Sequence, residues 1–338
     1  MPTYMYVSIS GEDKILIFTI DPVTGSLNPQ GEIIVSGHPS GMAFSPDQQF
    51  IYVGRKGDKS ISTFRRNLET GELSFIGTAQ VGMEPDWVAL DRKGRFLFST
   101  YFMEGKAGVY PIGSDGIVGK EPVQWITSSR GLHSVQTDPS NKFAFFPHIA
   151  GVGPNIILQY RFDESSGHFA PNNPDRAIPD VDAGPRHFCF HPELDILYFD
   201  NEEGSSVTAY HLNRSNGTLS AFQTVSTLPD DYKLKNRCAD IKISPSGESL
   251  YVSNRGLNTI ACYSVNSQTG ILTPVGRVPT DAEVRSFSMD PVGNFLFAAG
   301  LATGRLISYR VNKVTSELKQ LETHNVGKEP WWVLITKA

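Results

Sequence analysis

The amino-acid sequence predicts an all-β fold, a seven-bladed β-propeller of four-stranded antiparallel blades, on three observations. A phrase of two short apolar strands around a polar turn recurs along the 338 residues. A second phrase with a turn glycine recurs between its copies, and the two chain ends together supply one more copy. Four strands repeated at a nearly constant period are typical of propellers. Two stacked β-sandwiches are the alternative, but sandwiches do not produce a constant period.

The first phrase predicts the first and second strands of each blade. Its copies are GMAFSPDQQFIYV (41–53), WVALDRKGRFLFS (87–99), SVQTDPSNKFAFF (134–146), HFCFHPELDILYF (187–199), DIKISPSGESLYV (240–252) and FSMDPVGNFLFA (287–298). The residue before the turn is Ser45, Asp91, Asp138, His191, Ser244 and Asp290, at intervals of 46, 47, 53, 53 and 46 residues. Apolar strands around a turn rich in Pro, Gly, Asn and Asp indicate a β-hairpin.

The second phrase predicts the turn between the third and fourth strands. It reads DPVTGSL (21–27), NLETGEL (67–73), DESSGHF (163–169), NRSNGTL (213–219), NSQTGIL (266–272) and NKVTSEL (312–318), with SDGI (114–117) as a degenerate copy. A tight hairpin needs a positive φ, which glycine adopts without strain. Ser316 replaces glycine in the last copy, so modest strain is expected there.

The chain ends predict how the ring closes. YMYVS (4–8) matches FIYVG (50–54), so the chain opens on a second strand. EPWWVLIT (329–336) matches EPDWVALD (84–91), so it closes on a first strand, and Thr336 is the seventh marker. Pairing the C-terminal strand with the three N-terminal strands completes the seventh blade and leaves no free edge. The sequence thus predicts one domain over residues 1–338.

Composition excludes several classes of protein. The net charge is −5, without the basic stripe that a nucleic-acid partner requires. No run of 18 apolar residues or N-terminal signal pattern occurs, so we expect no membrane association. Three cysteines are too few for a disulfide framework and favour a reducing compartment. We therefore expect a cytoplasmic monomer or weak homo-oligomer.

Polar residues cluster where the propeller fold exposes them to its central channel. The residues that open the first strands face one channel mouth, and those of interest are His38, Asp86, His133, Arg186, His187, Asp240, Arg285 and Trp331. Glu202 and Arg255, which end second strands, return to the same mouth. Of the neighbours Trp331 and Trp332, one is expected to face the channel and the other to pack between blades.

This cluster predicts a pocket for a small anion. Arginines bind carboxylate or phosphate through two parallel hydrogen bonds, and His133 is expected to titrate near neutrality as a general base or acid. Any one of these residues, taken alone, is more often part of a structural ion pair. A metal bound by the histidines and aspartates stays open, but the spacing does not support it and nearby arginines disfavour a cation. No cofactor is expected, since no phosphate-binding glycine loop occurs. No G-x-S-x-G elbow occurs either, so nucleophilic catalysis by a serine is weakly supported.

Four segments carry a resemblance to a known family. GPRH-x-x-FHP (184–192), YFDNE (198–202), SP-x-G-x-x-LYVSNRG (244–256) and EPWWV (329–333) resemble the seven-bladed lactonases, which comprise propeller-type 6-phosphogluconolactonases and carboxy-muconate lactonizing enzymes. The resemblance covers the whole chain. It implies a catalytic quartet of His133, Arg186, Glu202 and Arg255.

The resemblance implies hydrolysis of a sugar-acid lactone, with 6-phosphogluconolactone as the substrate and His133 activating water. Arg186 and Arg255 would stabilise the oxyanion or hold the substrate, Glu202 would orient an arginine or relay a proton, and Arg285, His187, Asp240, Trp331, His38 and Asp86 would contact substrate. Two alternatives stay open, muconate cyclization at the same residues and a non-catalytic scaffold that binds anions. Whether Lys235 or Arg237, in the loop before the 239–241 strand, reaches the pocket also stays open.

Overall fold

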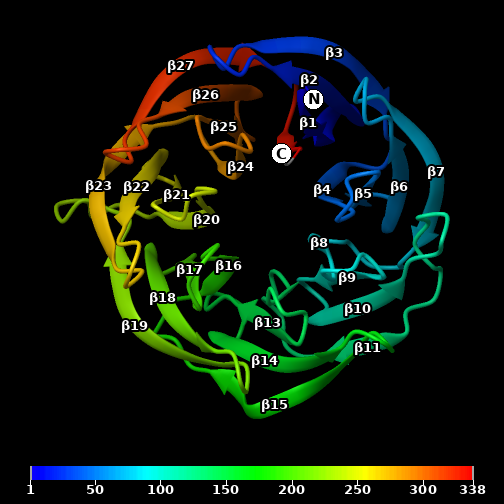
Figure 1. Ribbon diagram of the computed structural model, residues 1–338, viewed down its shortest axis with the longest axis horizontal. Helices are drawn as coiled ribbons and strands as arrows, with labels where there is room; N and C mark the ends of the chain where they lie inside the picture. Colours follow the sequence, from blue (N-terminus) through cyan, green and yellow to red (C-terminus); the bar gives the residue numbers. More distant parts are fainter. Residues whose placement is uncertain (1, 337–338) are drawn as a thin grey trace.

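A computed structural model describes residues 2–336 as a ring of seven four-stranded antiparallel sheets around a central axis (Figure 1). The predicted all-β, seven-bladed architecture is confirmed. Blades 1 to 6 follow one another along the chain, and blade 7 combines strands from both ends. The one helical element among the described residues is a short 3₁₀ turn, η1 (Ser10–Glu12).

The strands of each blade run outward from the axis in chain order. Blades 1 and 2 contain β4 (Pro39–Phe44), β5 (Phe50–Arg55), β6 (Ser60–Arg66), β7 (Leu73–Gln80), β8 (Trp87–Leu90), β9 (Phe96–Tyr101), β10 (Lys106–Pro111) and β11 (Gln124–Thr127). Blades 3 and 4 contain β12 (Gln136–Thr137), β13 (Phe143–His148), β14 (Ile156–Asp163), β15 (His168–Ala177), β16 (Pro185–Phe190), β17 (Ile196–Asn201), β18 (Ser206–Asn213) and β19 (Thr218–Ser226). Blades 5 and 6 contain β20 (Arg237–Ile243), β21 (Ser249–Arg255), β22 (Thr259–Val265), β23 (Leu272–Pro279), β24 (Val284–Met289), β25 (Phe295–Gly300), β26 (Arg305–Val311) and β27 (Leu318–Asn325).

Blade 7 closes the ring as the chain ends predict. It consists of β28 (Pro330–Ile335), β1 (Thr3–Ile9), β2 (Lys14–Ile20) and β3 (Leu27–Ile34), in that order from the axis. β28 pairs antiparallel with β1, and the two ends of the chain lie side by side in Figure 1. Beyond the paired residues, the backbone N–H of Tyr4 donates to Oγ1 of Thr336 at 3.0 Å. No sheet edge is left open at the junction.

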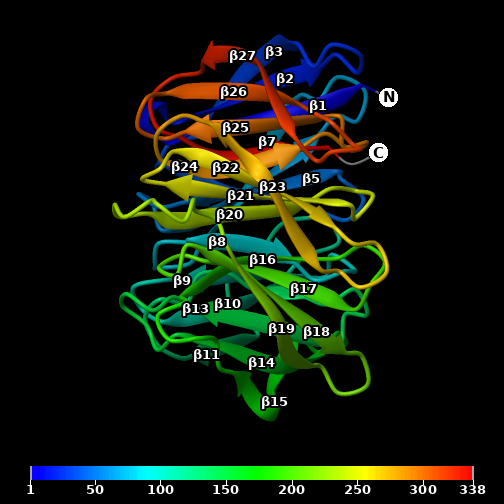
Figure 2. The ribbon, with the colours of Figure 1, turned by 90° about the vertical axis from the view of Figure 1, so that its left-hand side faces the viewer.

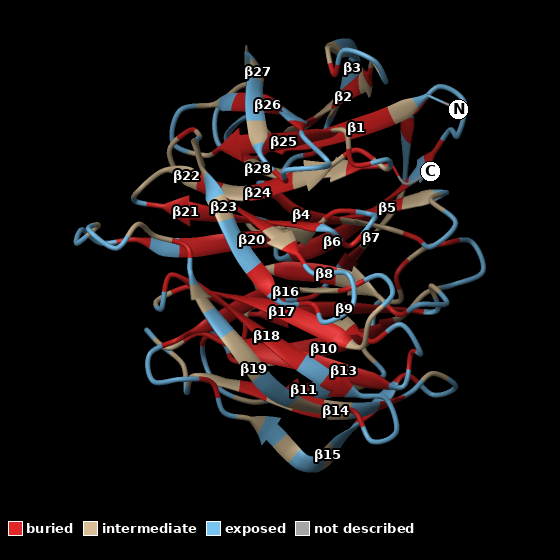
Figure 3. Cartoon of the chain, turned by 60° about the vertical axis from the view of Figure 1, so that its left-hand side comes forward, coloured by how far each residue is buried: buried red, intermediate tan, exposed pale blue. Residues whose placement is uncertain are grey.

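Burial follows the distance of a strand from the axis. The first three strands of each blade are mostly buried, whereas outer strands such as β15, β19 and β23 are largely exposed (Figure 3). Neighbouring sheets pack face to face (Figure 2) through apolar clusters that join two blades, for example Tyr6 of blade 7 with Val53 of blade 1. Each such interface removes apolar surface from water, which is the main force holding blades together.

The turn glycines are required by conformation and by close packing. Gly25 has a φ of 81°, and a Cβ placed on it would lie 2.4 Å from the ring of Phe295 in the preceding blade. Ser316, at the equivalent turn, adopts a φ of 62°, and its hydroxyl lies 2.7 Å from that of Ser249. The strain predicted at Ser316 is therefore present and is accompanied by this hydrogen bond.

Tyrosines of the second strands lock adjacent blades together at these turns. Tyr198 donates to the carbonyl of Gly270 at 2.8 Å, and Tyr52 donates to that of Gly116 at 3.0 Å. Tyr251 makes the same contact with the carbonyl of Ser316 at 3.1 Å. Each hydroxyl satisfies a carbonyl that the turn leaves without a ladder partner.

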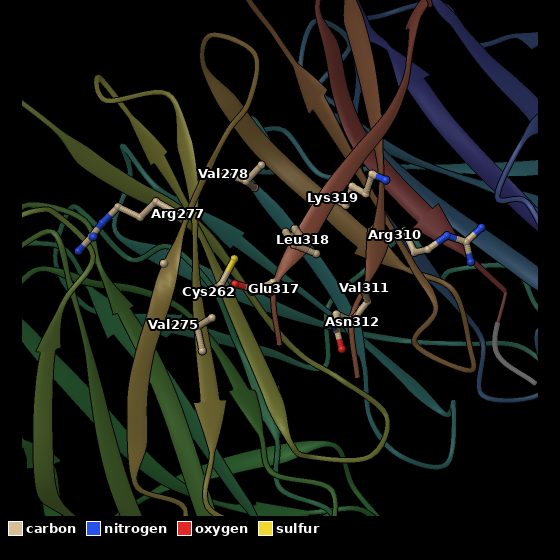
Figure 4. A pocket seen from close by; sticks show the side chains of 11 residues that line it. Cys262, Val275, Arg277, Val278, Arg310, Val311, Asn312, Glu317, Leu318 and Lys319 are labelled. Carbon is tan, nitrogen blue, oxygen red and sulfur yellow. The ribbon is translucent and has the colours of Figure 1, made fainter. Parts of the chain in front are cut away.

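A glutamine clamp joins the outer strands of blades 4 and 5. In β19, Oε1 of Gln223 accepts from the N–H of Leu272 at 2.8 Å, and its Nε2 donates to the carbonyl of Leu272 at 2.9 Å. The equivalent position in β23 is Gly276, since Ala209 pairs with Gln223 as Cys262 pairs with Gly276. A groove of about 510 Å³ lies there between β23 and β27 (Figure 4). This groove lies on the outer strands, away from the channel, at the place where a glutamine in position 276 would contact the next blade.

Candidate active site

The innermost strands present two residues per blade to the central channel. In blades 1, 4, 5 and 6 the pairing between the first two strands is interrupted at these positions, for example between Pro185 and Phe188. Such a β-bulge re-aims side chains that would otherwise alternate across the sheet. We call the first residue of each pair the mouth position and the second the partition position. Arg186 is a mouth residue and His187 is a partition residue.

The mouth positions bring together most of the predicted site. A cavity of about 60 Å³ at the channel mouth is lined by Lys56, Asp86, His133, Arg186, His187, Arg285, Trp331 and Trp332. Asp86, His133, Arg186, Arg285 and Trp331 come from the mouth positions of blades 2, 3, 4, 6 and 7. Six of the ten predicted residues therefore line one cavity.

Glu202 lies behind the cavity wall and holds the arginines. Its Oε2 is 2.8 Å from Nε of Arg186, and its Oε1 is 3.1 Å from Nη2 of Arg255 and 3.6 Å from Nη1 of Arg237. Burial raises the pKa of Glu202, but Arg186 and Arg255 outweigh it and the pKa is lowered overall. Glu202 is thus ionised, which favours an arginine-orienting role over proton relay.

Of the two arginines in this cluster, Arg186 faces the cavity and Arg255 does not. Arg186 lines the cavity and also donates to the carbonyl of Ala239. Arg255 is buried, donates to the carbonyl of Cys238 at 2.8 Å and is absent from the cavity wall. Neither Lys235 nor Arg237 lines the cavity, although Arg237, with a side chain that is 44% exposed, lies 3.6 Å from Glu202.

His133 is a neutral imidazole with unused hydrogen-bonding capacity. Its Nδ1 is buried and has no hydrogen-bond partner within residues 2–336. Its ring contacts Phe102 and His187, with centroids 5.6 and 5.0 Å away. Burial, followed by the charges of Arg186 and Arg255, lowers the pKa of His133 well below its usual range. The expectation that His133 titrates near neutrality is therefore wrong, because the imidazolium is both desolvated and repelled.

An aromatic and cationic wall stands on the side of the cavity formed by blades 1, 6 and 7. The Trp331 ring centroid is 4.9 Å from Nζ of Lys56 and 5.3 Å from the guanidinium carbon of Arg285. Lys56 is paired with Asp86, which also accepts from the N–H of Phe102 at 2.9 Å. Nε of Arg285 has no hydrogen-bond partner in the described part of the chain. Burial, Arg255 and Arg186 lower the pKa of Arg285 to about 10, so it stays charged at neutral pH.

The partition positions fill the channel below the cavity. Trp87, His187, Asp240 and Trp332 occupy them in blades 2, 4, 5 and 7, and the His187 ring lies 4.6 Å from Trp87 and 6.2 Å from Trp332. Asp240 is fully buried and does not line the cavity. Trp331 and Trp332 both line the cavity. Trp332 also packs against apolar clusters that join neighbouring blades, as predicted for one of the two tryptophans.

His38 lies at the rim, away from the cavity lining. Its φ is 56°, and its Nδ1 is 3.2 Å from the carbonyl of Ser10 in blade 7. The backbone N–H of His38 donates to Asp13 at 2.8 Å. These contacts give His38 a role in joining blades 7 and 1.

Lys56 is a cavity residue that inspection of the rim missed. Strand pairing places it one residue beyond Arg55, at the position equivalent to Glu202 and Arg255. Aligning FIYVGRK (50–56) with LYFDNE (197–202) and LYVSNR (250–255) would have identified it, since all three then end on an ionisable residue.

Residues 2–336 contain neither a membrane-spanning helix nor a cluster of metal-binding side chains. No helix in this range has the length and hydropathy of a membrane span. No group of three or more His, Cys, Asp or Glu side chains in the same range is placed to hold a metal ion.

Comparisons with known proteins agree with the architecture. The family model described as "Lactonase, 7-bladed beta-propeller" matches residues 2–90 and 76–335. A 6-phosphogluconolactonase of Pectobacterium carotovorum is 31% identical over 335 residues, which are 99% of each chain. A protein of the same name from Yersinia pestis is 31% identical over 339 residues, covering 100% of this chain and 99% of its own.

Among solved structures, the periplasmic gluconolactonase of Pseudomonas aeruginosa superposes with a TM-score of 0.90 at 23% identity, over 99% of both chains. That similarity establishes the fold. The family model and the full-length relatives go further, and with them the resemblance seen in the sequence is confirmed: the chain belongs to the seven-bladed β-propeller lactonase family.

Proposed function

We propose that this protein hydrolyses a sugar-acid lactone, with 6-phosphogluconolactone as the substrate, at the cavity around His133. The observation that carries the proposal is a neutral imidazole without a partner at Nδ1, set beside an arginine in a cavity with excess positive charge. Relatives that match the full chain bear the name 6-phosphogluconolactonase, which supports this choice of substrate.

The charge around the cavity suits a dianion. Among the described residues, Lys56, Arg186, Arg255 and Arg285 stand in or directly behind its wall. The two carboxylates that form ion pairs there are Asp86 and Glu202, and Glu202 also pairs with the partly exposed Arg237. Glu202 offsets part of the Arg186 and Arg255 charge, and Asp86 pairs with Lys56. Arg285 has no such partner within the described chain. A phosphate ester supplies the missing negative charge, and Arg285 is placed to bind it beside the Trp331 ring.

His133 acts as the base in the proposed reaction. It takes a proton from water as the water oxygen bonds to the lactone carbonyl carbon, which gives a tetrahedral oxyanion. Arg186 stabilises that charge from the cavity wall. The bond from carbon to ring oxygen then breaks, and the imidazolium returns the proton to the departing oxygen. The product is a hydroxy acid, whose carboxyl group releases its own proton to solvent. The lowered pKa of His133 makes its imidazolium a better proton donor in this last step and makes the neutral ring a weaker base in the first.

Activity assays on His133→Ala and Arg285→Met test this proposal. Hydrolysis of freshly generated 6-phosphogluconolactone is expected to fall at least about 100-fold in His133→Ala, the scale of a lost general base. Arg285→Met is expected to raise KM for the phosphorylated lactone and to leave KM for gluconolactone unchanged. Native-rate hydrolysis by folded His133→Ala would refute the proposed mechanism.

The same cavity bears on muconate cyclization, the alternative that the sequence leaves open. Arg186 of blade 4 and Arg285 of blade 6 both line the cavity, so each is placed to bind one carboxylate of a muconate. Parallel assays of purified protein on carboxy-muconate and on the phosphorylated lactone separate the two reactions. Turnover of the muconate alone would replace the proposal, and inactivity on both would favour an anion-binding scaffold.

We propose the cytoplasm as the site of action, with the protein as a monomer or weak homo-oligomer. The three cysteines are unpaired in the structure, which suits a reducing compartment. Fractionation of expressing cells and light scattering of the purified protein test both statements.

A further inference from the structure

The partition separates the cavity from a second compartment of the channel. A volume of about 660 Å³ on the far side is lined by the later residues of the innermost strands, including Lys242. His187 and Trp332 line both this compartment and the cavity. The wall between the two spaces is therefore a single layer of side chains, and groups on the far side act on the cavity through it.

Asp240 connects the two compartments through its carboxylate. Its Oδ1 accepts from Nδ1 of His187 at 3.0 Å and from Nζ of Lys242 at 2.6 Å. Its Oδ2 accepts from the backbone N–H of Phe287 at 3.2 Å. With its oxygens engaged in this way and its side chain fully buried, Asp240 has no direct role at the substrate.

The contact with Asp240 sets the tautomer of His187. Asp240 accepts a hydrogen bond, so the imidazole proton resides on Nδ1 and the lone pair is left on Nε2. Nη1 of Arg186 lies 3.1 Å from this Nε2 and 3.3 Å from Nδ1 of the same ring. The guanidinium that faces the cavity therefore contacts a neutral His187 ring, whereas an imidazolium would repel it.

The charge state of His187 depends on a balance of neighbours. Burial is the largest cause that lowers the pKa of His187 well below the usual range. Cations on three strands lower it further, namely Arg186 of β16, Lys242 of β20 and Arg255 at the end of β21. Asp240 is the carboxylate that bonds its ring and favours the imidazolium. The remaining neighbours are the neutral His133 ring, Trp87 and Trp332, and Asp200, which accepts from the His187 backbone.

We propose that Lys242 is a positioning residue: by neutralising Asp240 from the far compartment, it keeps His187 neutral and so holds Arg186 at the cavity. Lys242 and Asp240 both line the far compartment and not the cavity, and of the two only Lys242 is accessible from it, with a side chain that is 32% exposed against 0% for Asp240. Without it, a buried carboxylate would bond His187 with no counter-ion on its other side. That arrangement is the one that raises the pKa of a histidine.

NMR titration of the His187 ring nitrogens in Lys242→Met tests the proposal directly. The variant keeps the length and apolar stem of the side chain and removes its charge. We expect the midpoint of the His187 titration to rise by about one pH unit or more, the usual effect of an unopposed carboxylate neighbour. Lys242→Arg, which keeps the charge, is the matched control and should leave the midpoint unchanged. A second uncharged variant, Lys242→Gln, serves if Lys242→Met does not fold.

Kinetics give a second readout, which rests on the proposed lactonase function. The acid limb of the kcat/KM profile is expected to move upward by the same amount in Lys242→Met, while the rate above about pH 8 stays native, because His187 is neutral there in both proteins. A structural role for Lys242 would lower the rate at every pH. The double variant Lys242→Met/Asp240→Asn should return the His187 midpoint toward that of the wild type.

Two results would overturn the inference: a His187 midpoint unchanged in Lys242→Met, or an equal change in Lys242→Arg. If the wild-type protein hydrolyses no lactone, the proposed function fails, and the NMR titration still decides the role of Lys242.

Discussion

Asp200 is a carboxylic acid that burial keeps protonated up to neutral pH, and Asp200→Asn tests this reasoning. The side chain is fully buried in β17. Its Oδ1 accepts from the backbone N–H of His187 at 2.7 Å, and its Oδ2 has no hydrogen-bond partner within residues 2–336. Burial raises the pKa to about 7 against the opposing charge of Arg186. The amide of Asn keeps an acceptor for His187 and cannot ionise.

The magnitude follows from the two pKa values of Asp200. The group has an ordinary pKa of 3.8 when unfolded and about 7 when folded. A raised folded-state pKa contributes stability that is complete below pH 4 and is lost as the pH rises through 7. Each pH unit over which Asp200 is protonated in the folded but not the unfolded protein changes the unfolding free energy by about 1.36 kcal/mol. Between pH 5 and pH 8, the wild-type protein is therefore expected to lose about 3 kcal/mol of unfolding free energy relative to Asp200→Asn.

Urea unfolding of both proteins at pH 5, 6, 7 and 8, at constant ionic strength, measures this difference. Other titrating groups are common to the two proteins, so their contributions cancel. The ¹³C shift of the Asp200 carboxyl, followed over the same range, reports its titration directly. Parallel stability curves, together with a carboxyl that titrates near pH 4, would refute the argument that burial dominates at this position.

Three further predictions concern packing and charge. Gly276→Gln should restore the missing clamp onto the Leu318 backbone and raise the unfolding free energy by about 1–2 kcal/mol. Gly276→Ala should raise it by at most about 1 kcal/mol, because the unfolded chain loses entropy. Thermal unfolding compares the two variants, and equal stability of the Gln and Ala variants would contradict the clamp. Tyr198→Phe should cost about 1–2 kcal/mol in the same assay, because the Gly270 carbonyl loses its buried donor, with kcat/KM unchanged; an altered rate would show that the blade contact reaches the site. Glu202→Gln should cost about 3 kcal/mol and lower lactone turnover, since it leaves buried arginines without their counter-ion; native turnover in the folded variant would exclude Glu202 as their orienting group.

Sequence periodicity predicted the scaffold well because each blade repeats the same local rules. Apolar alternation, turn glycines and matching ends are local signals, and they suffice to place strands and the closure through β28. The mouth positions followed from the same alignment, which is why Arg186 and His133 were found. Lys56 was missed because the strand end was read one residue early.

The rest depended on features that no local pattern contains. A bulge points adjacent residues in different directions. Arg186, at the mouth position of blade 4, therefore lines the cavity, whereas Asp240, at the partition position of blade 5, is enclosed in the partition. Ionisation depends on burial and on neighbours from other blades, so the lowered pKa of His133 follows from three-dimensional packing. The sequence therefore predicts the residues that come together at the site more accurately than it predicts their charges.

The mouth positions show how a symmetric scaffold acquires an asymmetric site. Seven equivalent backbone positions carry different side chains, and the polar ones face each other only because the ring closes. Ser40 and Ala239 occupy this position in blades 1 and 5; Ser40 donates to the Gly54 carbonyl at 3.0 Å, and the Ala239 carbonyl accepts from Arg186. These two positions thus serve the scaffold, while His133 and Arg285 leave hydrogen-bonding atoms without partners in the described chain. Such atoms are costly to bury unless a ligand binds them, and this asymmetry is the physical reason for placing the chemistry at the channel mouth.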